Sequence, residues 1–205
     1  MIQAATAKKE EKQNTEIPDY LIHEIIDGQP LYYHGYKEVL NGTKTFEEIM
    51  GSSSLQFVII SYLLSLLYKV VDESKYMIAT NEAGIDLDYR NNLATDISIF
   101  DWKVLTPDKI SKKYADVPPF LTIEVDTDVG VTKKENGFSL TEYVHIKTQK
   151  LLDFGVEKVI WVFTSSQKIT IAEKGATDWL IKDWNQDIEM FNGTTFNIGQ
   201  YLKEK

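Results

Sequence analysis

The segment "PPFLTIEVDTD" (residues 118–128) carries three acidic side chains, of which Glu124 interrupts an apolar run and Asp126 follows two positions later. Burying an unpaired carboxylate costs several kcal/mol, which is comparable with the whole stability of a small domain. We therefore expect these acids either to lie at a solvated strand end or to meet a positive charge.

The two-residue period of a β-strand places these acids on one face. In residues 120–126 it puts Glu124 and Asp126 on the same side, opposite an apolar face. The same rule separates Asp96 from the isoleucines of "ATDISIF" (residues 94–100). If the two strands are neighbours, two to three carboxylates converge.

A lysine occupies the apolar face of a predicted helix at residues 139–155. Ser139 and Glu142 have the spacing of a capping box, and Gly155 stands at the expected C-terminal cap. Lys147 points through the middle of the face formed by Leu140, Tyr143, Val144, Leu151 and Phe154. Its ammonium either reaches water along the surface or meets the buried carboxylates. In the second case, the carboxylates and the lysine form a hard-oxygen site suited to a divalent ion such as magnesium.

The remaining pattern predicts one α/β domain. Asp27-Gly28 marks a hairpin over residues 20–34, and residues 54–72 form an amphipathic helix in which Gln56 falls on the apolar face and needs a buried partner. The other expected elements are strands at 75–80, 83–89 and 94–101, a loop with a helical turn at 106–119, a flexible connection at 128–137, antiparallel strands between 156 and 191, and a short helix near 197–203.

Composition limits the classes of protein. The chain has 205 residues and a net charge of −9, which argues against a protein that coats nucleic acid through a basic surface. It has no cysteine, so disulfides and thiolate metal sites are excluded. We expect a polar, disordered leader at residues 1–18, a single domain at 19–205, no membrane segment, and a reducing cytoplasmic location. An active site that meets phosphates through metal ions remains compatible with the acidic charge.

An aspartate on one strand, a glutamate on the next and a lysine on the following helix resemble the PD-(D/E)xK restriction-endonuclease-like superfamily. Four segments more closely resemble the Uma-two family of predicted restriction endonucleases: "EIIDGQPLYY", "ATDISIF", "FLTIEVDTD" and "KTQKLLDFGVEKVIWVF". Their order and spacing, over roughly residues 20–165, carry the resemblance. It implies a restriction-endonuclease-like mixed β-sheet flanked by helices, with an N-terminal hairpin and C-terminal antiparallel strands.

The resemblance also implies roles for individual residues. Asp96 and Glu124 would bind the metal, the Val125 carbonyl would be a further ligand, and Lys147 would be the family lysine, moved from the strand to the helix. The cofactor would be Mg²⁺ or Mn²⁺, and the reaction would be hydrolysis of phosphodiester bonds in nucleic acid, with DNA as the expected substrate.

The sequence departs from the family pattern in several places. Thr95 replaces the proline of the PD pair, Asp126 stands where the superfamily strand has its lysine, and Gln56 takes a position where relatives often have histidine. Asp126, Gln56, Glu24 and Glu82 are auxiliary site candidates. For Glu24, in the first hairpin, we expect a solvated charge at the sheet edge.

Three hypotheses follow from the sequence. The protein is a magnesium-dependent endonuclease, a catalytically inactive relative that binds a protein or nucleic acid, or an acidic structural module whose lysine pairs with a carboxylate. Metal binding distinguishes the first from the third, and turnover distinguishes the first from the second. A homodimer would suit the cleavage of both strands of a duplex, but no interface can be predicted.

Overall fold

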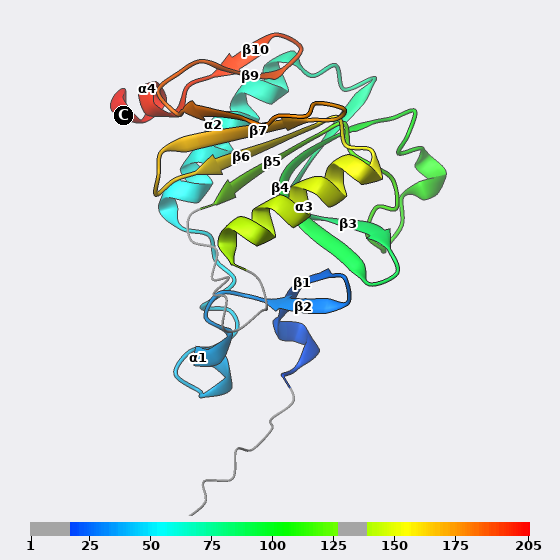
Figure 1. The fold of residues 1–205 in the computed structure, drawn as a ribbon, viewed down its shortest axis with the longest axis vertical. Coiled ribbons are helices and arrows are strands. Elements are labelled where there is room, and N and C mark those ends of the chain that lie inside the picture. The colour runs from blue at the N-terminus through cyan, green and yellow to red at the C-terminus, as the bar shows by residue number, and fades with distance from the viewer. Residues whose placement is uncertain (1–16, 127–138) are drawn as a thin grey trace, which may run out of the picture.

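The computed structural model describes residues 17–126 and 139–205 (Figure 1). The expected leader, apart from its last two residues, and the expected connection at 128–137 lie outside these ranges. The helical elements are η1 (Asp19–Leu21), α1 (Tyr36–Leu40), α2 (Ser54–Val70), η2 (Pro107–Lys109), α3 (Leu140–Phe154) and α4 (Ile198–Lys203). The strands are β1 (Ile22–Ile26), β2 (Gln29–Tyr32), β3 (Tyr76–Asp88), β4 (Asn91–Asp101), β5 (Leu121–Asp126), β6 (Lys158–Phe163), β7 (Lys168–Glu173), β8 (Leu180–Asp183), β9 (Ile188–Phe191) and β10 (Thr194–Phe196).

A mixed sheet forms the centre of the fold. Within the described ranges it has eight strands in the order β2-β1-β4-β5-β6-β7-β8, with β3 also paired to β4, while β9 and β10 form a separate two-stranded sheet. Figure 1 shows α3 across one face of the large sheet, α2 on the opposite face, and the β1–β2 hairpin at one end. This is the expected α/β architecture.

Helix α3 connects two parallel strands. β5 pairs with β6 in parallel, from Leu121 opposite Lys158 to Asp126 opposite Phe163, and such a pair requires a crossover connection. The capping box predicted for Ser139 and Glu142 is formed at the start of the helix. This crossover holds α3, and therefore Lys147, over the part of the sheet that contains β4 and β5.

The two faces of the sheet have separate apolar cores. Ile59, Leu63 and Leu67 of α2 pack in one cluster with the isoleucines of β4 and β5. The residues of α3 pack in a second cluster with the hairpin and with Trp161. None of the helices in the described ranges combines the length and hydropathy that a membrane crossing needs.

The structure differs from the sequence-based expectation in several elements, among them the short helix α1, which was not expected. Residues 75–80 and 83–89 belong to the single strand β3, which continues through an irregularity at Asn81 and Glu82. β6, β7 and β8 form the expected antiparallel run, but β9 does not continue it and pairs with β10 in the separate sheet. β10 was not expected, since three residues are too short to show a strand period.

Gly155 fixes the end of α3. Its φ is +123°, and an added Cβ would lie 3.1 Å from the Cγ of Pro118. We expect Gly155→Ala to lower the free energy of unfolding by about 1–3 kcal/mol through strain and crowding. Gly42→Ala is the control for strain alone, because its φ is +75° and no atom lies within 4 Å of the added Cβ. Urea unfolding would contradict this expectation if Gly155→Ala cost no more than Gly42→Ala.

Candidate functional site

One edge of β4 is shared by two strands that do not meet. β3 pairs with β4 along almost its whole length, so β1 and β5 must use the opposite edge. β1 pairs there at Asn92, and β5 pairs from Ile97 to Ile99. In the described chain, residues 93–96 have no strand partner on this edge. Buried backbone groups in such a gap need other hydrogen-bond partners.

Side chains fill this gap. The backbone N–H of Ala94 donates to Glu24 Oε1 at 3.0 Å, and its carbonyl oxygen accepts from Lys147 Nζ at 2.7 Å. The same Nζ donates to Glu24 Oε1 at 2.7 Å. An ion pair from β1 and α3 therefore takes the place of a neighbouring strand.

Lys147 is a buried ammonium. Its side chain is only 2% exposed, which excludes an ammonium that reaches water. Its third proton is directed to the Tyr143 hydroxyl at 3.2 Å, which itself donates to Glu24 Oε2 at 2.8 Å. Burial lowers the pKa of Lys147, but the Glu124 and Glu24 carboxylates outweigh burial and raise this pKa well above its ordinary value. Lys147 is therefore an electrostatic group and not a proton acceptor.

The expectation of a solvated Glu24 is wrong. Glu24 is 2% exposed, because the strand alternation that buries Ile26 also turns Glu24 inward. Burial raises its pKa, but the Lys147 and His23 charges and the hydrogen bonds from Lys147 and Ala94 outweigh burial, so the pKa of Glu24 is lowered. This carboxylate is ionised and compensates the charge of Lys147.

Glu124 is the second buried carboxylate beside the single ammonium of Lys147. Its Oε1 lies 3.1 Å from Lys147 Nζ, within ion-pair distance, yet the three protons of Lys147 are directed to other acceptors. No donor among the described residues forms a hydrogen bond to this oxygen. Burial is the main cause that raises the pKa of Glu124 to about 8, with further contributions from the Asp96 and Glu24 charges and an opposing one from Lys147.

Asp96 lies where β4 and β5 separate. The N–H of Val125 donates to Asp96 Oδ2 at 2.7 Å, so a carboxylate oxygen replaces a backbone acceptor. Gln56 Nε2, at the start of α2, donates to the Val125 carbonyl at 3.0 Å and lies 3.5 Å from Asp96 Oδ1. Gln56 thus has the buried partner that its position requires. Burial raises the pKa of Asp96, although the hydrogen bond from Val125 opposes this.

A β-bulge brings Glu82 toward the same region. Thr80 faces Ile97 and Ala83 faces Thr95, so Asn81 and Glu82 together oppose Asp96. Their φ angles are +65° and +54°, in the left-handed region that is uncommon for side chains other than glycine. Bulges are frequent next to active sites, where they redirect a side chain.

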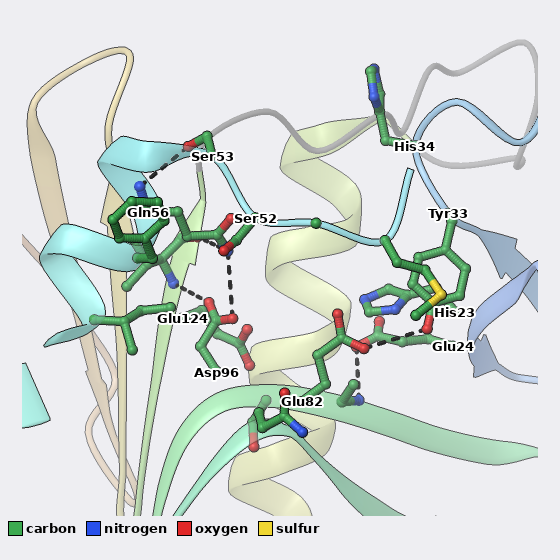
Figure 2. Close-up of a pocket in the computed structure, with 18 of the residues that line it drawn as sticks. His23, Glu24, Tyr33, His34, Ser52, Ser53, Gln56, Glu82, Asp96 and Glu124 are labelled. Carbon is green, nitrogen blue, oxygen red and sulfur yellow. Dashed lines mark hydrogen bonds between the residues drawn. The ribbon is translucent and has the colours of Figure 1, made fainter. Parts of the chain in front are cut away.

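Glu82 stands across the site from Asp96. The Tyr33 hydroxyl donates to Glu82 Oε2 at 3.4 Å, and burial together with the Glu82 charge raises the pKa of Tyr33 to about 12. Figure 2 shows Glu82, His23, Glu24 and Tyr33 on one side of the pocket, with Asp96, Glu124 and Gln56 on the other. The bulge therefore places a further acid on the wall that faces Asp96 and Glu124.

A cavity of about 900 Å³ connects these groups. Asp96, Glu124, Lys147, Val125, Gln56, Glu24 and Glu82 all line it. Seven of the eight candidate site residues thus lie around one cavity, and the side chain of the eighth, Asp126, lies outside the described part of the chain. Cavities of this size can hold small-molecule ligands.

Tyr143 has a part that sequence reasoning did not assign to it. Tyr143 lies four residues before Lys147, so both side chains are on one face of α3. From the sequence alone, Tyr143 counts only as one of the apolar residues of that face. The helical period could have paired the hydroxyl with the ammonium. Its second partner, Glu24, lies 119 residues away in sequence, and no local signal shows that contact.

The donor set suits a divalent cation. Within the described ranges, no three His, Cys, Asp or Glu side chains are grouped as a metal site, so a cation here would need the Val125 carbonyl beside Asp96 and Glu124. These are hard oxygen ligands, and Glu124 Oε1 is a buried oxygen without a hydrogen bond. A positive charge would compensate the excess of carboxylates, so the residues fit such an ion.

Comparisons with solved structures show a likeness of fold. No family model matches the chain, and no curated protein matches it. The structure is similar to the crystal structure of a candidate nuclease of the DUF820 (Uma-two) family from Anabaena variabilis, with a TM-score of 0.61, 14% sequence identity, and coverage of 88% of this chain and 89% of that chain. The chain therefore shares the fold of that protein.

Removal of the buried Lys147 ammonium should lower the stability of the protein. We expect Lys147→Met to lower the free energy of unfolding by about 3–5 kcal/mol, because it leaves Glu24 and Glu124 unpaired inside the protein. Addition of Glu24→Gln should recover part of this loss. The control is Lys150→Met on the same helix, whose pair with Asp27 is partly exposed and should contribute less than about 1 kcal/mol. Equal losses for the two lysines in urea unfolding would contradict the buried-pair account.

Glu124 should make the free energy of unfolding depend on pH. Burial raises the pKa of Glu124 to about 8 in the folded protein, above the ordinary glutamate value of 4.5, so the folded protein binds this proton more tightly than the unfolded chain. Its contribution to stability is fully present below the lower value and is lost as pH rises through the higher one. We expect Glu124→Gln to gain stability relative to the unmodified protein over this window, by on the order of a few kcal/mol. A difference that stays constant with pH would show that Glu124 is ionised throughout.

Proposed function

We propose that this protein is a metal-dependent nuclease that hydrolyses phosphodiester bonds, with Mg²⁺ or Mn²⁺ held by Asp96, Glu124 and the Val125 carbonyl. The observation that carries the proposal is the buried Glu124 oxygen without a hydrogen bond, at a cavity in a nuclease-like fold. The cation would polarise water and stabilise the negative charge that develops on the phosphoryl oxygens. Nucleic acid, with DNA first, is the proposed substrate.

Lys147 would act through its fixed charge. Its ammonium is held by Glu24, Ala94 and Tyr143, and its pKa is raised, so it has no role as a general base in this proposal. It lies 3.1 Å from Glu124 Oε1 and orients that carboxylate toward the cavity. Glu24 and Tyr143 are positioning residues, since they fix the ammonium and do not need to meet the substrate.

A catalytically inactive relative is the second candidate. The contacts of Gln56 with the Val125 carbonyl and Asp96 engage two of the proposed ligand atoms, and the protons of Lys147 are all directed to protein acceptors. A protein with these contacts could keep the fold and bind a protein or nucleic-acid partner without turnover.

The deciding experiment combines metal binding with cleavage. We expect Mn²⁺ to bind the unmodified protein in calorimetry, and supercoiled plasmid DNA to be cleaved with Mg²⁺ or Mn²⁺. Glu124→Gln should reduce cleavage by about 10²-fold or more, because it removes a charged ligand without changing side-chain size. Single-stranded DNA and RNA in parallel reactions would define the substrate class.

The matched control is Glu157→Gln, which changes an exposed carboxylate paired with Lys174. It should bind Mn²⁺ and cleave like the unmodified protein. Metal binding without cleavage of any nucleic acid would favour the inactive relative. No metal binding at all would leave Glu24, Lys147 and Glu124 as a structural charge cluster.

A further inference from the structure

The side-chain amide of Gln56 lies against two atoms that the proposed function assigns to the cation. Its Nε2 is 3.0 Å from the Val125 carbonyl oxygen and 3.5 Å from Asp96 Oδ1. A carbonyl oxygen and an ionised carboxylate accept hydrogen bonds and cannot donate them. The amide must therefore present its N–H₂ group to this position, because its oxygen would be repelled.

The groups on both sides of the Gln56 contact are held in place by other hydrogen bonds. Ser53 caps helix α2 and its side chain accepts from the Gln56 N–H at 3.2 Å, which fixes the first helical turn. Asp96 is held from the other side, since its Oδ2 accepts from the Val125 N–H at 2.7 Å. The amide, the carbonyl and the carboxylate thus belong to three elements that the core fixes independently, α2, β5 and β4.

From these contacts we infer that Gln56 is a built-in competitor of the cation: its amide N–H₂ group satisfies the Val125 carbonyl and Asp96 in the metal-free protein, and binding of the ion weakens these contacts. The inference rests on the proposed function, because it assumes a cation at these oxygens. Each of these oxygens has more than one lone pair, but a cation bound to them repels the positively polarised N–H₂ group beside it, so each metal-binding event weakens the contacts of Gln56. The metal affinity is reduced by the free energy that those contacts lose.

The alternative for the same side chain is that it is a ligand. Rotation of the amide by half a turn would present Oε1 to the ion instead of Nε2. The two roles predict opposite effects of removing the amide. A ligand strengthens metal binding, whereas a competitor weakens it.

The test is Gln56→Met, which keeps the length of the side chain and removes both amide groups. We expect Mn²⁺ to bind this variant about 5- to 10-fold more tightly than the unmodified protein in calorimetry, as the loss of one to two competing hydrogen bonds implies. Without metal, its melting temperature should fall by about 2–4 °C, because the Val125 carbonyl loses its donor. Added Mn²⁺ should raise the melting temperature of the variant by more than that of the unmodified protein.

The matched control is Gln149→Met on α3, an exposed glutamine that donates to Asp153 at 2.8 Å and does not line the cavity. Its Mn²⁺ affinity should not change. Equal or weaker Mn²⁺ binding by Gln56→Met would overturn the competitor role while the proposed metal site stands. If neither the unmodified protein nor Gln56→Met binds Mn²⁺, the proposed function fails and the inference fails with it. Binding by Gln56→Met alone would support the inference.

Discussion

The shared edge of β4 is the constraint on which the site depends. β1 and β5 both pair with this edge but leave the backbone of Ala94 between them without a strand partner on that side. A buried backbone donor and acceptor cannot remain unsatisfied, so Glu24 and Lys147 supply the missing hydrogen bonds. The charged cluster is therefore a part of the sheet as well as a candidate site, and its removal would leave the Ala94 N–H and carbonyl without these hydrogen bonds.

Charge balance explains what this cluster can do. One ammonium faces two buried carboxylates, and Glu24 has the shorter contact with it. Glu124 consequently retains a raised pKa and an oxygen without a hydrogen bond, and the neighbouring Asp96 adds further negative charge. A buried region with this imbalance is stabilised by a proton or by a cation. Protonation of Glu124 would relieve the same imbalance without a cation.

The sequence alone was sufficient to predict the helices and strands that have a strong hydrophobic period. The helical period identified Lys147 on the apolar face of α3, and strand alternation identified Asp96 and Glu124 on one side of neighbouring strands. Local patterns did not show the burial of Glu24, because its partners are 70 and 123 residues away. The bulge at Asn81 and Glu82 looked like a break between strands, since polar residues there resemble a turn. Both errors concern tertiary contacts that override local preference.

The distance along the chain between Glu24 and Lys147 affects how the protein matures. Contacts between residues 123 positions apart require a large loop to close before they can form. During synthesis, β1 and β4 leave the ribosome well before α3, so Ala94 and Glu24 lack their ammonium until that helix arrives. A chain that is still being made, or one that has partly unfolded, would thus carry the acids without the assembled charge cluster.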